Sequence, residues 1–409
     1  MTTVWRAPVD AGLALLTGGS AGELMAAVLS AVDGRLLRWT SRQVDHQPGR
    51  RTTVSYSARV RWPDGSVTGE TLGASSGRLP EGVARLSDGD TEVGMWRFPF
   101  DPDLPALPAA CDHERMRKLV QGAGLGKGEG TVRLRVRAYR PRRRAVIEVT
   151  ASGGGRVFVK VVHPHRAREL RDRHRLAGAE GAAVPAVLGW TENGLLVLDA
   201  LPGRTLREVL VAEGTVRLDP ESVIETLDSL SDTLAVGDRR RTWGQRAGHY
   251  AGVIAAAAPE LGLRAQAVAD AVDHDAPEGP DLPVHGDLYE SQLMMHGDRV
   301  SGLLDLDSAG RGERLDDAGC LLAHLSVLAQ LHPRRADEIH RLGAGLERRF
   351  AGDLGRAALA RRTAAVVLSL ATGPHRVQER QWRLKTELRI ALAEQWLRYG
   401  SSSTAGPPR

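Results

Sequence analysis

Two short segments of the chain decide its fold: HGDLYESQ at His285–Gln292 and LLDLD at Leu303–Asp307. Between them, apolar residues precede and follow a His-Gly-Asp turn at 296–298. Short apolar runs on either side of a Gly-containing turn predict a β-hairpin. The two strands of this hairpin are expected to bring Gln292 close to Asp305.

The same residues supply the acidic half of a phosphoryl-transfer site. Asp287 can receive or orient the proton of a substrate hydroxyl group. The carboxylate of Asp305 and the amide oxygen of Gln292 are hard oxygen ligands of the kind that Mg²⁺ prefers. In such a site the metal neutralises phosphate charge and the protein positions the reacting groups. The alternative is that Asp287 and Asp305 are an ordinary turn acid and an ordinary strand-end acid, but their combination favours the functional interpretation.

A basic half is expected nearer the N-terminus. Only four of the 55 basic residues are lysines, and one of them, Lys160, lies in the apolar run Arg156–Val162. This run predicts a β-strand, and a cation in a buried strand is costly unless it is paired. Lys160 therefore either binds an anionic ligand or lies on an edge strand and points into water.

The acidic segments resemble the motifs of the aminoglycoside phosphotransferase and choline kinase superfamily, the small-molecule relatives of protein kinases. That superfamily usually has Asn where this chain has Gln292, whose amide oxygen sits on a side chain one methylene longer. The resemblance implies that Asp287 is the catalytic base. It also implies that Gln292 and Asp305 bind Mg²⁺.

For the basic half, the resemblance implies that Lys160 binds the α- and β-phosphates of ATP. Glu169, in the predicted helix that follows, would orient Lys160, and Glu180 is a second candidate for that position. The Gly-rich loop of protein kinases is absent. The turn Arg140–Arg144 (RPRRR) stands in its place and either covers the triphosphate or faces solvent.

Two further segments resemble parts of the same superfamily. A buried run ending in Pro-Gly resembles the hinge, whose backbone reads the adenine edge, so Asp199, Ala200 and Leu201 are predicted to contact the purine. Asp316–Ala318 resembles the downstream aspartate segment that holds the catalytic loop without taking part in the chemistry. His285 is likewise expected to hydrogen-bond the loop backbone.

Residues 1–110 exceed what a kinase N-lobe needs, and we expect them to form a non-catalytic cap. They contain a faint repeat, in which Pro48–Ala58 parallels Pro141–Ala151 and Glu70 stands where the second copy has its lysine. Chance similarity between two arginine-rich hairpins is the alternative. Gln292 and the cap together resemble the maltokinase-like branch of the superfamily. The proline-rich segment 96–105 predicts an extended linker.

Composition sets wider bounds. With 409 residues, 42% of them hydrophobic, the chain is expected to form two or three domains. No apolar run reaches the roughly 18 residues of a membrane span, and no export signal is recognisable, so a cytoplasmic protein without a membrane partner is predicted. Cys111 and Cys320 show neither metal-ligand spacing nor a disulfide framework. The net charge of +5 does not require a nucleic-acid partner.

The predicted fold is α+β, a bilobal protein-kinase-like fold with an N-terminal β-rich lobe, a mainly helical C-lobe and an extra cap. The expected parts are the cap at 1–110, the N-lobe at 111–202, the C-lobe with its catalytic hairpin at 203–400 and a disordered tail at 401–409. Helices are predicted at 219–234, 318–331, 359–370 and 384–399.

The predicted activity is an ATP- and Mg²⁺-dependent transfer of phosphate to a hydroxyl of a small polar molecule. A sugar or amino-sugar kinase is an alternative, and so is a catalytically inactive nucleotide-binding protein of the same fold. The acceptor pocket is expected near the helices after Asp219 and near Gly373–Trp382. Glu290, Asp307 and Glu379 either attract a cationic acceptor or are solvated surface residues.

Overall fold

The computed structural model describes residues 11–79, 81–88, 91–125, 130–179, 181–212, 216–272, 279–402 and 406–408. The chain divides into two compact units. The first comprises Met1–Arg171, Val187–Ala200 and Pro374–Trp382, and the second comprises Asp172–Ala186, Leu201–Gly373 and Arg383–Arg409. This division differs from the predicted lobes, because the cap and the N-lobe share one unit and the segment 172–186 joins the helical unit.

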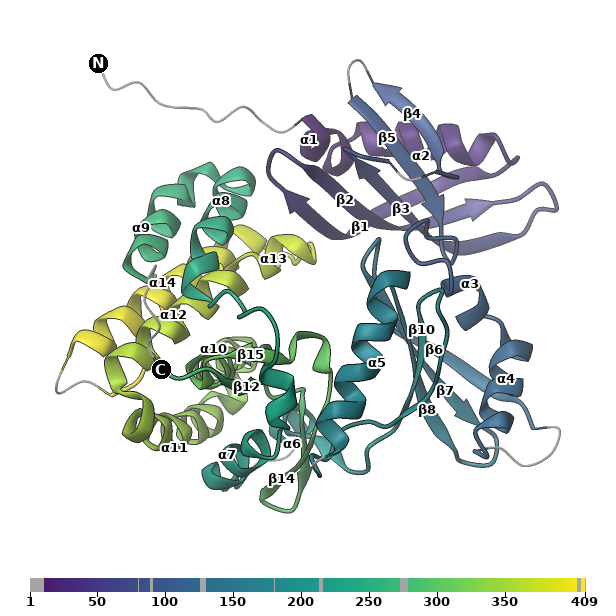
Figure 1. Ribbon diagram of the computed structural model, residues 1–409. Helices are drawn as coiled ribbons and strands as arrows, with labels where there is room; N and C mark the ends of the chain where they lie inside the picture. The colour runs from purple at the N-terminus through teal and green to yellow at the C-terminus, as the bar shows by residue number, and fades with distance from the viewer. Residues whose placement is uncertain are drawn as a thin grey trace, which may run out of the picture. The chain divides into compact units, whose positions relative to one another are not determined.

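The first unit begins with a five-stranded antiparallel sheet that carries two helices, α1 (Ala11–Thr17) and α2 (Ser20–Ser30) (Figure 1). The sheet has the order β1-β2-β3-β5-β4. Buried residues of the helices, such as Leu16 and Met25, pack on Val54 and Tyr56 of the second strand. The strands are β1 (Arg35–Gln47), β2 (Arg51–Arg61), β3 (Val67–Ser76), β4 (Ala84–Asp88) and β5 (Thr91–Arg97).

A second antiparallel sheet in the same unit has the same pattern of strand order, β6-β7-β8-β10-β9. The predicted repeat therefore extends from the hairpin sequence to the topology of the whole sheet. Helices α3 (Leu107–Ala110) and α4 (His113–Gly122) contribute to the core on one face, and the start of α5 (Pro164–Ala179) packs on Val162 and Leu196. The strands are β6 (Val132–Arg140), β7 (Arg144–Ala151), β8 (Arg156–Val162), β9 (Val187–Trp190) and β10 (Leu195–Asp199).

The two sheets of this unit are joined through Arg142, at the tip of the β6–β7 hairpin. Its buried guanidinium donates from Nε to Asp103 at 2.6 Å and from Nη1 to the Ser75 hydroxyl at 3.0 Å. Its backbone N–H donates to Asp101 at 2.8 Å, and the Tyr139 hydroxyl donates to the same carboxylate at 2.7 Å. Burial raises the pKa of Asp101 although these donors oppose the shift.

Two predictions are corrected at this junction. The segment 96–105 is no free linker: Trp96 belongs to β5, and Asp101 is buried in the contact with Arg142. Prolines exclude a helix, but they do not exclude packing. The Arg140–Arg144 turn was expected to cover phosphate or face water, yet its central guanidinium binds the N-terminal sheet.

We predict that Arg142→Ala lowers the free energy of unfolding by about 3 kcal/mol, because it leaves the half-buried Asp103 without its cation. Urea denaturation followed by circular dichroism measures the change. The control is Arg143→Ala, since Arg143 is half exposed and pairs with Asp45 at 3.4 Å; its removal is expected to cost less than about 1 kcal/mol. Equal losses in the two variants would contradict the junction described above.

The second unit is mainly helical, with α10 (Arg314–Leu331) at its centre (Figure 1). Fourteen of the eighteen residues of α10 are buried, which is why its sequence lacks a polar face. Helices α11 (Ala336–Leu354) and α12 (Arg356–Ala371) pack against it, α8 (Ala247–Ala257) and α9 (Gly262–Val272) pack on α12, and α7 (Pro220–Asp228) packs on α11. Helix α14 (Trp382–Ser401) reaches α10 through Trp396, whose Nε1 donates to the Ser326 hydroxyl at 3.3 Å. The remaining helices are α6 (Leu206–Ala212) and α13 (Gly373–Arg376).

Two small sheets of this unit carry the two segments that the sequence analysis singled out. One has the order β11-β13-β14 and the other pairs β12 with β15. The predicted hairpin is present, and its strands pair Leu293 with Leu303. The strands are β11 (Arg204–Thr205), β12 (Leu282–Val284), β13 (Leu293–His296), β14 (Arg299–Leu303) and β15 (Gly310–Gly312).

The α+β class is confirmed, with antiparallel sheets first and a helical region after them. The helix predicted at 219–234 is too long, because it ends at Asp228 and Ser231 caps a separate 3₁₀ turn. The tail also differs: α14 continues to Ser401, and Pro407 and Pro408 line a small cavity with α10, α11 and α14. Residues 403–405 and 409 lie outside the described residues.

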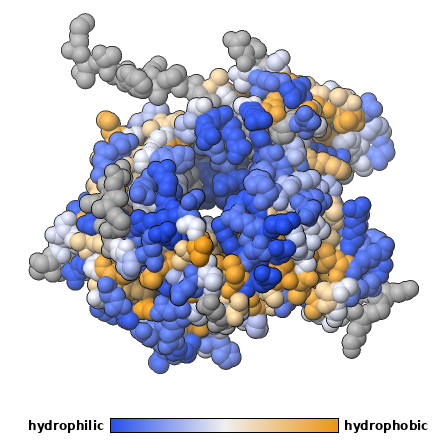
Figure 2. All heavy atoms as spheres, viewed as in Figure 1, coloured by the Kyte–Doolittle hydropathy of each residue, from blue (hydrophilic) through white to orange (hydrophobic). Residues whose placement is uncertain are grey.

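The face seen in Figure 2 is mostly hydrophilic, with apolar residues in scattered groups. This agrees with a chain in which 26% of the residues are charged. In the part of the chain that the structure describes, no single helix has both the length and the apolar character needed to cross a membrane. Helices α1 and α2 meet that test only as a pair, and they are bent by 70° relative to each other.

Candidate active site

The loop His285–Gln292 connects β12 to β13 and needs glycine at its second position. Gly286 has φ +75°, in the left-handed region where side chains are disfavoured. A Cβ atom there would lie 2.4 Å from the Ser308 carbonyl oxygen and 2.7 Å from the Arg240 side chain. The close approach of the loop to the segment after Asp305 therefore depends on the absence of a side chain.

The loop is held by a buried carboxylate on α10. Asp317 accepts hydrogen bonds from the backbone N–H groups of His285, at 2.8 Å, and Gly286, at 2.7 Å. Burial raises the pKa of Asp317 although His285, Arg314 and these two donors oppose the shift. The His285 ring contacts the Leu304 carbonyl at 2.8 Å and accepts from the Asp287 backbone N–H at 3.4 Å. The predictions that Asp317 holds the loop and that His285 hydrogen-bonds its backbone are confirmed.

The hairpin brings the two predicted metal ligands to one end of β13 and β14. The Leu304 N–H donates to the Gln292 carbonyl at 2.8 Å, and Asp305 is the next residue. Asp305 has φ +57°, a conformation that aspartate tolerates better than most residues and that often marks a functional position. Gln292 is buried and Asp305 is half-buried, so both are shielded from bulk water.

Arg240 links the two catalytic segments, and the sequence did not reveal it. Its guanidinium donates to the Ser308 carbonyl and, at 3.3 Å, to the Gly286 carbonyl. Burial, together with the nearby Arg246, lowers the pKa of Arg240. Arg173 contributes a similar contact by donating to the Asp307 carbonyl. The only sequence signal was an arginine cluster at 239–241, which resembled the general arginine richness of the chain.

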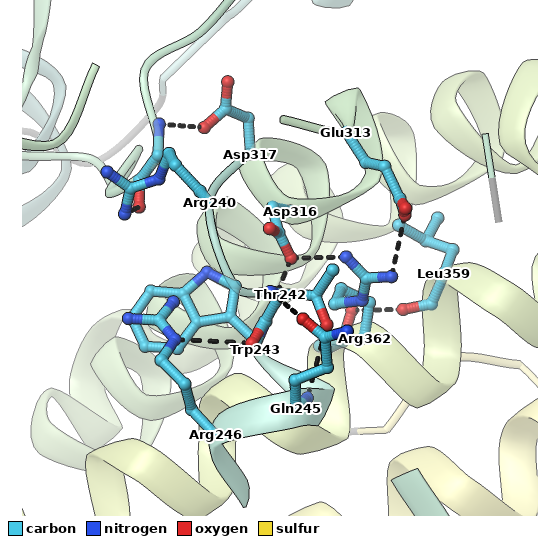
Figure 3. A network of polar contacts seen from close by, with 12 residues as sticks. Arg240, Thr242, Trp243, Gln245, Arg246, Glu313, Asp316, Asp317, Leu359 and Arg362 are labelled. Atoms are coloured by element: carbon cyan, nitrogen blue, oxygen red, sulfur yellow. Dashed lines mark hydrogen bonds and ion pairs between the residues drawn. The ribbon is translucent and has the colours of Figure 1, made fainter. Parts of the chain in front are cut away.

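Behind the loop, a buried ionic network fixes the start of α10 (Figure 3). Arg362 of α12 donates to Glu313 at 2.9 Å and also to Asp316, and all three side chains are buried. The backbone N–H of Trp243 donates to the Asp316 carboxylate at 3.2 Å. Burial alone would lower the pKa of Arg362, but the two carboxylates outweigh it and raise the pKa. The network thereby positions the helix turn that carries Asp317.

Arg362→Ala is expected to lower the free energy of unfolding by about 3–5 kcal/mol, because it leaves two buried carboxylates without this cation. The matched control is Arg348→Ala, since Arg348 is an exposed arginine on the neighbouring helix α11. Chemical denaturation of both variants measures the difference. A loss below about 1 kcal/mol in Arg362→Ala would show that the network contributes little.

Two alternatives were predicted for Glu290, and the structure excludes the one in which it is a solvated surface residue. Its side chain is 1% exposed and accepts from Arg207 Nη1 at 2.6 Å, while its Oε2 has no hydrogen-bond partner among the described residues. Burial raises the pKa of Glu290 although Arg207 opposes the shift. Glu290 is therefore a buried structural carboxylate. Asp307 and Glu379 are both half-buried.

Two residues of α10 lie beside Asp287. Cys320 Sγ is 3.9 Å from Asp287 Oδ1, and burial together with the Asp287 charge raises the pKa of this thiol well above its ordinary value. His324, one turn further along α10, stacks on Tyr289 with a ring-centroid distance of 4.4 Å. Neither neighbour was predicted: the sequence pointed to Asp316–Ala318 as the contact with the loop and carried no motif at Cys320 or His324.

The basic half belongs to the first unit. Lys160 lies in β8, the central strand of its sheet, and is 4% exposed, so the edge-strand alternative is wrong. Because strand residues alternate between faces, Lys160 shares its face with Val162, on which α5 packs. Glu169 lies on α5 with its side chain exposed, and Glu180 lies outside the described residues.

The predicted hinge coincides with the change from one unit to the other. The first unit contains Asp199 and Ala200, and the second resumes at Leu201. The Asp199 carboxylate accepts the Ala200 N–H at 2.8 Å, and all three residues are half-buried. The backbone N–H of Ala200 is therefore already engaged by the neighbouring carboxylate.

Antiparallel sheets followed by a helical unit agree with the kinase-like fold that the sequence predicted. The family model described as "Phosphotransferase enzyme family" matches residues 142–354, which is just over half of the chain. The chain belongs to this family, and it is a small-molecule kinase, as the sequence predicted. No curated protein gives a significant match.

Several solved structures are similar at low identity. A thermostable mutant of aminoglycoside phosphotransferase APH(4)-Ia, in a ternary complex with ADP and hygromycin B, is 14% identical, with a TM-score of 0.45 over 70% of this chain and 99% of its own. A choline/ethanolamine kinase family protein from Mesorhizobium loti is 19% identical, with a TM-score of 0.45 over 69% and 94%. A type I macrolide 2'-phosphotransferase is 16% identical, with a TM-score of 0.40 over 68% and 97%.

Proposed function

We propose that this protein transfers the γ-phosphate of ATP, with Mg²⁺, to a hydroxyl group of a small polar acceptor. The observation that carries the proposal is the fixed arrangement of Asp287 on a loop pinned by Asp317, next to a hairpin that presents Gln292 and Asp305. In this assignment Asp287 takes the acceptor proton. Gln292 and Asp305 bind Mg²⁺, which orients the phosphates and offsets their charge.

The proposal assigns nucleotide contacts to the residues that the sequence predicted for them. Lys160 binds the α- and β-phosphates, and Glu169 orients it. Asp199, Ala200 and Leu201 present backbone groups to the adenine. The support for Lys160 is its burial in a central strand, because a buried ammonium requires an anionic partner. The similar APH(4)-Ia structure contains ADP, which agrees with a nucleotide at such a site.

The N-terminal sheet is assigned no catalytic part. The position that corresponds to Lys160 is Glu70, and its carboxylate accepts from Arg97 Nε at 2.7 Å and from the Thr68 hydroxyl at 2.5 Å. A carboxylate repels phosphate, so this sheet cannot bind ATP in the manner proposed for the second sheet. Its contacts with Arg142 make it a support for the β6–β7 hairpin.

The deciding experiment compares nucleotide binding with phosphate transfer in two variants. Asp287→Asn is expected to retain ATP affinity and to lose transfer by several orders of magnitude, because a positioned base acts on the acceptor alone. Lys160→Ala is expected to weaken ATP binding strongly. Calorimetric titration with ATP, and a transfer screen over aminoglycosides, amino sugars, maltose, choline and homoserine, supply the two readings.

The control for nucleotide binding is Lys118→Ala, since Lys118 is 70% exposed and pairs with Glu114 at 3.6 Å. It is expected to bind ATP as the unmodified protein does. If Lys118→Ala and Lys160→Ala behave alike, the assignment of Lys160 is wrong. If ATP binds and no acceptor is phosphorylated, the protein is the non-catalytic nucleotide binder that was the alternative.

Gln292→Leu is expected to raise the Mg²⁺ concentration needed for half-maximal rate, because it keeps the side-chain volume and removes the oxygen ligand. Gln292→Asn retains that oxygen and is expected to keep measurable activity. Mg²⁺ requires nearly octahedral geometry at about 2.0–2.1 Å, so water must replace a missing ligand. The measurement is rate against free Mg²⁺ at fixed ATP. An unchanged Mg²⁺ dependence in Gln292→Leu contradicts the assignment.

A further inference from the structure

The side of the catalytic loop that faces α10 presents a second set of metal-ligand atoms. One atom each from Asp287, Cys320 and His324 lies within 4.8 Å of the others, and this is the only such group of three found among the described residues. Cys320 and His324 are four residues apart and therefore lie on one face of α10. Cys320 is fully buried, whereas Asp287 and His324 are half-buried, so the group can be reached from solvent.

The chemistry of this set differs from that of the Mg²⁺ ligands. Carboxylate and amide oxygens suit Mg²⁺, whereas a thiolate and an imidazole select zinc and other late transition metals. Zinc forms bonds of about 2.3 Å to sulfur and about 2.0–2.1 Å to nitrogen, and catalytic or inhibited sites commonly have three protein ligands. The distance of 3.9 Å between Cys320 Sγ and Asp287 Oδ1 is close to the distance that separates two ligand atoms bound to the same zinc ion.

A second, independent observation points to the same place. Glu290 Oε2 is buried without a hydrogen-bond partner among the described residues, and it lies 3.9 Å from His324 Nδ1. A carboxylate behind a metal-bound imidazole fixes the orientation of the ring and increases its basicity. Stacking on Tyr289 restrains the same ring from its face.

We propose that Asp287, Cys320 and His324 form an inhibitory Zn²⁺ site, with Glu290 orienting the imidazole. When Asp287 binds zinc, its carboxylate cannot accept the proton of an acceptor hydroxyl, and the ion occupies the space next to it. Zinc binding is then mutually exclusive with phosphate transfer. The inhibitory part of this inference rests on the proposed role of Asp287, whereas the metal-binding part does not.

The test uses Co²⁺ as a spectroscopic substitute for Zn²⁺ on the full chain in excess Mg²⁺. The unmodified protein is expected to bind one equivalent and to show the absorption of thiolate-to-cobalt charge transfer, which added Zn²⁺ removes. Cys320→Ala is expected to lose this band, and Cys111→Ala, which changes the other cysteine, is expected to keep it. His324→Phe keeps the ring on Tyr289, and we expect it to bind the metal at least about tenfold more weakly.

The same variants are then assayed for phosphate transfer with and without Zn²⁺. We expect equimolar Zn²⁺ to inhibit the unmodified protein and Cys111→Ala, and to leave Cys320→Ala active. Absence of the cobalt band, or the same band in Cys320→Ala, overturns the site. If Cys320→Ala does not fold, His324→Phe decides by the same readings. A normal band with transfer insensitive to Zn²⁺ overturns the inhibition and the role of Asp287, and leaves the metal site standing.

Discussion

The geometry of the catalytic loop depends on one buried carboxylate. Asp317 accepts the N–H groups of two successive residues, His285 and Gly286, and hydrogen bonds to a charged acceptor contribute about 1.5–3 kcal/mol each. The cost of burying that charge is visible in its raised pKa. In return, the two hydrogen bonds hold the turn that directly precedes Asp287. Such preorganisation is what electrostatic catalysis of phosphate transfer requires.

Arginine side chains also hold separate segments together elsewhere in the chain. Arg142 joins two sheets, Arg240 joins two catalytic segments, and Arg362 neutralises two buried carboxylates. A planar guanidinium with five donors can satisfy several acceptors at once, which a lysine cannot do. The arginine richness of the chain thus serves internal contacts, at least in part. Lysine is rare in the chain, and among the lysines that the structure describes Lys160 stands out because it is buried in a central strand.

Local sequence patterns predicted what local contacts determine. The hairpin and the strand that carries Lys160 follow from contiguous residues, and both predictions are confirmed. Apart from the contact of Asp317 with the loop, which the family resemblance predicted, the long-range contacts could not be predicted. Arg142 donates to Ser75, 67 residues earlier in the chain, and Cys320 lies beside Asp287, 33 residues away. No periodicity or motif in the sequence indicates either contact. The helix at 219–234 was overextended because its apolar period continues past the serines that end it.

The two five-stranded sheets of the first unit differ little, although one is assigned a supporting role and the other a role in nucleotide binding. Both have the same pattern of strand order, and each carries one charged side chain in its third strand, Glu70 in one and Lys160 in the other. Glu70 is satisfied within its own sheet by Arg97, so it needs no ligand. Lys160 is buried as well, in the central strand of the second sheet. A strand position whose charge is neutralised within its own sheet stabilises the fold, and the proposed function gives the same position in the second sheet the opposite charge and an anionic ligand.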